Sequence, residues 1–201
     1  HSVRTLGECR DVAAGDITIA TALMEARTVG GDPGLLARLA ALTGPEQIWP
    51  SAEFFRAKWD EQKARHRKFN NTEYNLEPNI KGCPGGLRDV QTVGWVAKRH
   101  FHATSTLELV ARGFLTAHEY EALANGQDFL WRVRYALHML ADRAEDRLLF
   151  DYQLELAQLF GYTDDERGLG VEHFMKDYFR CVLKLGVLNE MLTQLFDEAI
   201  L

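Results

Sequence analysis

A glycine-containing turn holds the residues of this chain that are best suited to bind an anion. It reads KGCPGGLRD from Lys81 to Asp89 and leads directly into an amphipathic stretch. Gly85 and Gly86 allow backbone angles that direct successive N–H groups toward one point, and a helix that begins here adds free N–H groups and its positive dipole end. Phosphate groups bind at such helix starts. The turn therefore predicts half of a phosphate-binding site.

Two basic side chains flank these glycines. Lys81 and Arg88 would place full positive charges beside the turn, and an arginine can hold a phosphate with two N–H donors. Asp89 would lie in the first turn of the helix, where it can cap the helix or hold Arg88 in place. The alternative interpretation is structural, with PGG as a simple turn and Asp89 as an ordinary first-turn acid. The residues alone leave both interpretations open.

Two further segments carry basic residues on expected helices. In WRVRYALH, Arg134 and His138 are four residues apart and therefore share one helix face. They can line a nucleotide pocket, although a single histidine on a helix is more often a core or surface residue without a ligand. The segment FRAKWDEQKARHRKF, residues 55–69, fits a face toward phosphates or, more commonly, a solvated helix face.

Capping residues and apolar periodicity divide the chain into helices of ordinary length. Asp16 is expected to cap a helix over residues 17–27, and a helix is expected over residues 88–101. Two Ser/Thr-x-x-Glu capping boxes are expected at Ser105 and at Thr116, the second opening a helix that runs to about residue 141.

Strand-like patterns are confined to SVRT, RTVGG and RLLF. The expected fold class is mainly α, a helical bundle with a small N-terminal β/α remnant.

Composition bounds the class of protein. With 201 residues, 46% of them hydrophobic and 26% charged, the chain can bury a sizeable core. A net charge of −6 argues against non-specific binding to nucleic acid or a membrane surface. The chain has no apolar run of roughly 18 residues and begins with polar residues, so we expect a cytoplasmic protein.

Several catalytic and metal-binding signatures are absent from the sequence. The three cysteines are far apart and form no CxxC pair, which predicts neither a disulfide framework nor a zinc site. The sequence has no GxxxxGK[ST], GxGxxG, GxSxG, HExxH, His-Asp or Asp-x-Asp motif. By its residues, the chain has a candidate phosphate half-site, no metal ligands and no complete catalytic centre.

Several motifs, in one order, carry a resemblance to a known family. YNLEPNIKGCPGGLRDVQTVGWVAKRHF, GFLT, FLWRVRYALH, EDRLLFD and LNEMLTQLFDEAI resemble the bifunctional PII uridylyltransferase/uridylyl-removing enzymes, and the opening HSVRTLGEC and LMEAR extend the match over the chain. That family joins a nucleotidyltransferase domain, a helical companion domain, an HD-type hydrolase domain and two ACT domains. The resemblance implies that residues 1–45 end the first domain and that residues 46–201 form the second.

The resemblance also implies a reaction and its partners. The full-length enzyme would transfer UMP from UTP to a tyrosine of the signalling protein PII, using Mg²⁺ held by an Asp-x-Asp motif upstream of His1. The HD and ACT domains would follow Leu201, so the chain would hold no catalytic residue and would be inactive alone. Its partners would be UTP, PII and its own nucleotidyltransferase, HD and ACT domains, with no nucleic acid and no membrane.

The resemblance sharpens the candidate site. We expect Lys81, Gly85, Gly86, Arg88 and Asp89 to approach the triphosphate or pyrophosphate, and Arg134 and His138 to line the same cleft. One alternative is a helical regulatory or docking module. Another is the corresponding region of a glutamine synthetase adenylyltransferase, which carries a related GG-[IL]-R-[DE]-[IV] motif.

Overall fold

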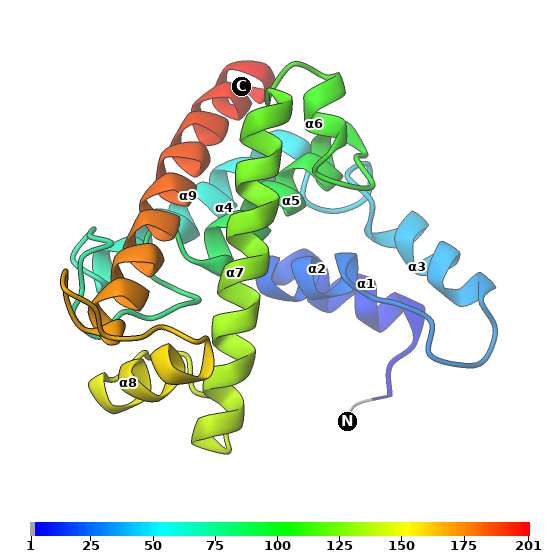
Figure 1. The fold of residues 1–201 in the computed structure, drawn as a ribbon. Helices are drawn as coiled ribbons and strands as arrows, with labels where there is room; N and C mark the ends of the chain where they lie inside the picture. The colour runs from blue at the N-terminus through cyan, green and yellow to red at the C-terminus, as the bar shows by residue number, and fades with distance from the viewer. Residues whose placement is uncertain (1–2) are drawn as a thin grey trace.

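The computed structural model describes residues 3–201, and most of these residues lie in helices (Figure 1). In chain order the helices are α1 (Leu6–Gly15), α2 (Ile17–Met24), α3 (Gly34–Thr43), α4 (Ser51–Lys68), α5 (Leu87–Phe101), α6 (Glu108–Ala111), α7 (Ala117–Ala141), α8 (Phe150–Leu159) and α9 (Gly170–Ile200). The described part contains no strand, only isolated bridges between Asn79 and Arg147 and between Asp165 and Gly168. The expectation of a mainly α fold is confirmed.

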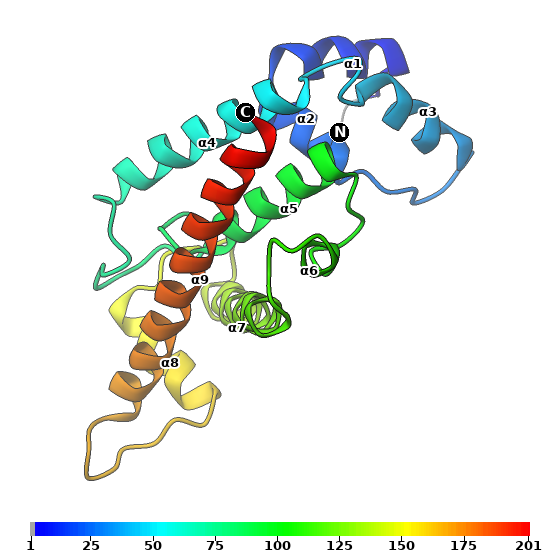
Figure 2. The ribbon, with the colours of Figure 1, turned by 90° about the horizontal axis from the view of Figure 1, so that it is seen from above.

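The two longest helices, α7 and α9, cross and organise the main core (Figure 1). Helix α9 also packs on α4, α5 and α8, and it crosses the α4–α5 pair when the molecule is seen from above (Figure 2). Its apolar side chains recur at helical spacing, so one continuous face is buried. The buried members of this seam include Phe174, Tyr178, Leu185, Leu192 and Phe196. Within residues 3–201, none of the helices combines the length and apolar character that crossing a lipid bilayer requires.

The expected β remnant at the N-terminus is wrong for the part that the structure describes. His1 and Ser2 lie outside the described residues, and Thr5 is the N-cap of α1. The Thr5 N–H donates to Glu8 Oε2 at 2.7 Å, while the Glu8 N–H donates to Thr5 Oγ1 at 3.2 Å. This reciprocal capping box satisfies two N–H groups at a helix start and so favours helix over strand.

Other expected caps were right in part. Asp16 accepts the Thr18 N–H at 2.7 Å and begins α2, and the Thr116 box begins α7 as expected. At the other box, the Glu108 carboxylate bonds the N–H and hydroxyl of Thr104, one residue before the expected Ser105. The strand-like RTVGG and RLLF segments form no strand.

Helix α5 is fastened to the N-terminal helices by Arg99. Its buried guanidinium donates to the Thr43 carbonyl at 2.7 Å, to the Trp49 carbonyl at 2.9 and 3.1 Å, and to the Ile48 carbonyl. The side chain thereby satisfies carbonyl groups at and beyond the end of α3, which would otherwise lack partners. The expected boundary between residues 45 and 46 lies in the segment that connects α3 to α4. The division into two domains there remains a prediction.

The PGG turn packs directly against α9. Gly85 has a φ of +70°, and a Cβ atom built on it would lie 1.9 Å from the Val182 carbonyl oxygen. Glycine is required here twice, once for the left-handed backbone and once for the close approach of the turn to the helix. The turn is therefore part of the packed core.

Replacing Gly85 by alanine tests this packing. We expect Gly85→Ala to lower the free energy of unfolding by roughly 2–5 kcal/mol, from left-handed strain together with overpacking. Gly94→Ala is the matched control, because Gly94 lies within α5 and nothing stands within 4 Å of an added Cβ. That variant should be unchanged or up to about 1 kcal/mol more stable. Urea unfolding measures both, and equal effects of the two changes would contradict this account.

Candidate functional site

The backbone N–H groups of the PGG turn already have partners inside the protein. From Gly85 to Arg88, each N–H donates to an oxygen of residues 80–83 or of Asp89. The bonds are Gly85 N to Asp89 Oδ2 at 2.8 Å, Gly86 N to Cys83 O at 2.9 Å, Leu87 N to Ile80 O at 3.1 Å and Arg88 N to Lys81 O at 2.9 Å. The N–H groups of Gly85 and Gly86 are therefore not free in this geometry, which favours side chains as the anion ligands, and phosphate binding at these glycines stays a prediction.

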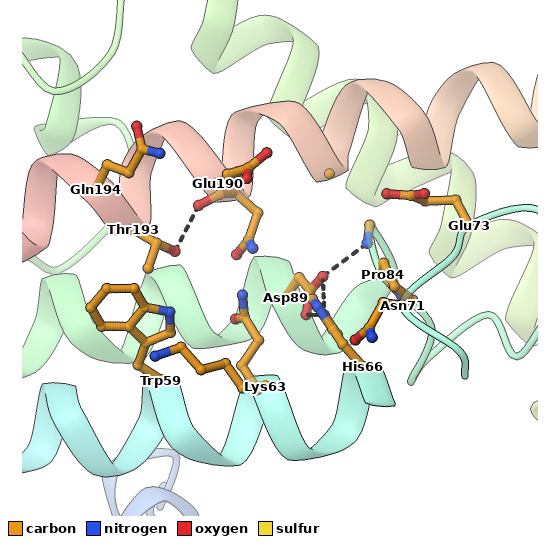
Figure 3. Close-up of a pocket in the computed structure, with 14 residues that line it drawn as sticks. Trp59, Lys63, His66, Asn71, Glu73, Pro84, Asp89, Glu190, Thr193 and Gln194 are labelled. Atoms are coloured by element: carbon orange, nitrogen blue, oxygen red, sulfur yellow. Dashed lines mark hydrogen bonds and ion pairs between the residues drawn. The ribbon is translucent and has the colours of Figure 1, made fainter. Parts of the chain in front are cut away.

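Asp89 is the buried anchor of this turn. Its side chain is 1% exposed, and it receives the guanidinium of Arg65 and the Gly85 N–H. His66 Nε2 lies 3.0 Å from both of its carboxylate oxygens, as Figure 3 shows. Asp89 thus joins α4 to the start of α5 and does not hold Arg88, which was one of the roles considered for it.

Arg134 and His138 do share a helix face, and a carboxylate that the sequence analysis did not single out holds them both. Arg134 Nε lies 2.6 Å and His138 Nε2 lies 3.3 Å from Asp146 Oδ1. The backbone of the same segment pairs with the loop before the PGG turn, since the Ile80 N–H donates to the Asp146 carbonyl at 2.8 Å. This pairing places Lys81 beside the cluster from α7.

The pKa of Asp146 reflects these neighbours. Burial by itself would raise the pKa of Asp146, but hydrogen bonds from Arg134 and His138, with the charges of Arg134 and Lys81, outweigh it and lower the pKa. The structure thus brings together three of the predicted site residues, Lys81, Arg134 and His138, around Asp146.

Arg88 lies between this cluster and α4. It is half-buried, and its guanidinium stands over the Trp95 ring at 5.2 Å from the ring centroid. Burial lowers the pKa of Arg88, and the nearby charge of Arg65 lowers it further. Among residues 3–201 no carboxylate forms an ion pair with Arg88, whereas Arg65 and Arg134 are both held by one. Arg88 is therefore a partly desolvated cation beside other cations, a setting that favours an anion.

The sequence analysis missed two contributors to this arrangement. Asp146 lies in the EDRLLFD string, which was used only for the resemblance, and Arg65 lies in the basic segment that also fits a solvated face. The spacing of acidic and basic residues along one helix does not indicate which other helix it contacts. The local sequence pattern therefore gave no signal for the contacts of Asp146 and Arg65.

Residues 3–201 hold no cluster of side chains typical of a metal site. In the part of the chain that the structure describes, no three His, Cys, Asp or Glu side chains come together in a way that suits a metal ion. The expectation that the Mg²⁺ ligands lie outside this chain stays a prediction, and no chemical step is assigned to the metal here.

The Asp89 anchor predicts a strong effect on stability. Asp89→Asn should lower the free energy of unfolding by about 3–5 kcal/mol, because it leaves the charge of Arg65 without its buried partner. Asp60→Asn, an exposed change on α4, should cost less than about 0.5 kcal/mol. Urea unfolding of the two variants provides the comparison. A loss of under about 1 kcal/mol for Asp89→Asn would show that the anchor contributes little.

The Asp146 cluster predicts a pH dependence. Because its pKa is lowered by folding, Asp146 stabilises the protein above about pH 4, the range of a free aspartate, and the contribution is lost as pH falls through its folded pKa. We expect the free energy of unfolding to fall less steeply with acid in Asp146→Asn than in the wild type. Asp128→Asn, an exposed change on α7, should keep the wild-type slope. Parallel curves for wild type and Asp146→Asn would rule out this role.

Comparisons with known proteins place the chain in a family. The family model described as GlnD PII-uridylyltransferase matches residues 53–193. Proteins named bifunctional uridylyltransferase/uridylyl-removing enzyme from Ectopseudomonas mendocina, Pseudomonas aeruginosa and Azotobacter vinelandii are each 54% identical over 201 residues. The match covers 100% of this chain but 22% of each relative, so the chain spans about a fifth of their length. No solved structure matches. The chain therefore belongs to the PII-uridylyltransferase family.

Proposed function

We propose that this chain is the helical, nucleotide-side part of an enzyme that transfers UMP from UTP to a tyrosine of PII. The full-length protein would also remove UMP hydrolytically, and this chain by itself would be inactive. Membership of the family supports the transfer, and the names of the relatives include both uridylyl transfer and uridylyl removal. The same comparisons favour this function over the corresponding region of a glutamine synthetase adenylyltransferase.

The observation that carries the proposal is the unpaired guanidinium of Arg88 within a group of basic side chains. Lys81, Arg134 and His138 gather around one carboxylate, Asp146, and Arg88 lies close enough to feel the charges of Arg134 and Asp146. The charges of Asp146 and of Glu61, which is paired with Lys58, also reach Arg88, but neither carboxylate forms an ion pair with it in residues 3–201, so a phosphate oxygen entering here would meet several donors. In our proposal Arg88 contacts the triphosphate or the departing pyrophosphate, and Arg134 and His138 line the same cleft.

The remaining predicted residues have indirect roles in this proposal. Asp89 and Gly85 fix the start of α5 against α4 and α9. The location of Arg88 in the first turn of α5 is thereby determined. Gly86 keeps the turn tight, because a Cβ atom there would lie 2.9 Å from the carbonyl oxygens of Cys83 and Ile80. These residues would position the phosphate contacts without touching the nucleotide.

A second candidate function is docking of a protein partner. Trp131, Tyr135 and Met139 are exposed and lie four residues apart, so they form an apolar stripe on α7. The Arg134 guanidinium lies over the Trp131 ring at 5.5 Å, which joins the stripe to the basic group. A partner such as PII would bury this stripe, in which case the basic group would serve recognition of the protein.

Kinetics of the full-length enzyme separate the two functions. Arg88→Ala should lower kcat/KM for UTP by roughly 10- to 100-fold, the value of one or two charge-assisted hydrogen bonds. Hydrolytic removal of UMP should be unchanged, and so should transfer by Arg67→Ala, an exposed α4 control. Steady-state rates at varied UTP and at varied PII measure this. A rise only in KM for PII would favour docking, and a loss of thermal stability with wild-type UTP kinetics would reject both roles.

A further inference from the structure

A cavity lies beside the Asp89 anchor, and its lining is distinct from the basic group. It has a volume of about 400 Å³ and lies between α4, the turn at Pro84 and α9 (Figure 3). Its lining includes His66, Asp89, Asn189 and Glu190 but none of Lys81, Arg88, Arg134 and His138. The proposed transfer therefore leaves this cavity without a role.

Two carboxylates line the cavity without an ion-pair partner in residues 3–201. Glu73 comes from the loop after α4 and lies against Gly186 of α9, where an added Cβ would come within 3.2 Å of its Oε1 atom. Glu190 lies on the same helix one turn further along. Neither forms a salt bridge in this part of the chain, whereas Asp89 is neutralised by Arg65 and His66.

Buried amides add hydrogen-bonding capacity that the protein itself does not use. Asn189 is 5% exposed and Gln62 is 7% exposed, and both line the cavity. The amide oxygen of Asn189 is shielded from solvent and accepts no hydrogen bond from residues 3–201. A buried polar atom without a partner costs about 1–3 kcal/mol. Rotation of the amide can present this oxygen to a donor in the cavity. The resulting hydrogen bond would remove that cost.

Lys63, a basic residue of the cavity lining, already has partners on its own helix. Lys63 Nζ lies 3.9 Å from the centroid of the Trp59 ring and 4.0 Å from Asp60 Oδ1. Its position beside the Trp59 ring is visible in Figure 3. The buried atom of the cavity that lacks a partner in residues 3–201 is an acceptor, and two carboxylates of the lining have no ion pair there, so a cation with N–H donors would complement them.

We propose that this cavity binds an ammonium or guanidinium group, with Glu73 and Glu190 as counter-ions and the Asn189 amide as acceptor. The cation is either a free small amine or a lysine or arginine side chain from another part of the full-length protein. Its size is limited to a few carbon atoms by the volume of the cavity. This inference does not depend on the proposed transferase function.

Calorimetric titration with n-butylammonium and with agmatine tests the proposal, with butan-1-ol as the uncharged counterpart of the first. The amines should bind the 201-residue chain and butan-1-ol should not. Glu73→Gln and Glu190→Gln should each raise Kd by roughly tenfold, the value of one charge-assisted hydrogen bond, and added NaCl should weaken binding. Glu198→Gln, an exposed α9 control outside the cavity, should bind as the wild type does.

Titration of the full-length protein distinguishes the two sources. Binding to both proteins indicates a free amine, and binding to the 201-residue chain alone indicates that the full-length protein supplies its own basic side chain. Binding to neither protein would overturn the proposal, as would equal binding by the two glutamine variants and the wild type. Trp59 fluorescence, identified with Trp59→Phe, should change on binding and locate the amine in this cavity.

Discussion

The arrangement of the basic group and of the cavity beside α9 depends on one buried carboxylate. Asp89 lies at the start of α5, excluded from water, and receives Arg65 and His66 of α4 and the Gly85 N–H. A buried charge is tolerated only when its oxygens are satisfied, so the three donors must stay in place together. This requirement fixes the PGG turn against α4 and α9. It also fixes the direction in which the neighbouring Arg88 leaves the helix.

Consecutive residues of α5 therefore face two different environments. About 100° of rotation separates neighbours on a helix, so Asp89 faces the cavity beside α9 while Arg88 faces Trp95 and the basic group near α7. Arg65 and Arg134, each held by a carboxylate, stand near Arg88, whose own guanidinium forms no ion pair in residues 3–201. Structural ion pairs thus prepare a single side chain for the proposed anion.

The glycines of the turn have a different purpose from the one that their pattern favours. In sequence, two glycines before a helix indicate a cradle of N–H groups for phosphate. In the structure, Gly85 permits contact with the Val182 carbonyl, and the N–H groups bond carbonyl and carboxylate oxygens a few residues away. The turn motif thus contributes rigidity, and in the proposed function it is the side chains of Lys81 and Arg88, not its backbone, that meet the nucleotide.

The sequence by itself determined the helical class, most helix starts and which basic residues could act, since caps and apolar periodicity are local properties. It correctly placed Arg134 and His138 on one face and the Thr116 capping box before α7. It did not reveal the helix start at Thr5, Asp146 as their shared partner, or the engaged N–H groups of the PGG turn. Only the tertiary structure decided these last two, because backbone carbonyls carry no sequence signal and Asp146 meets Lys81 across a loop pairing between distant segments.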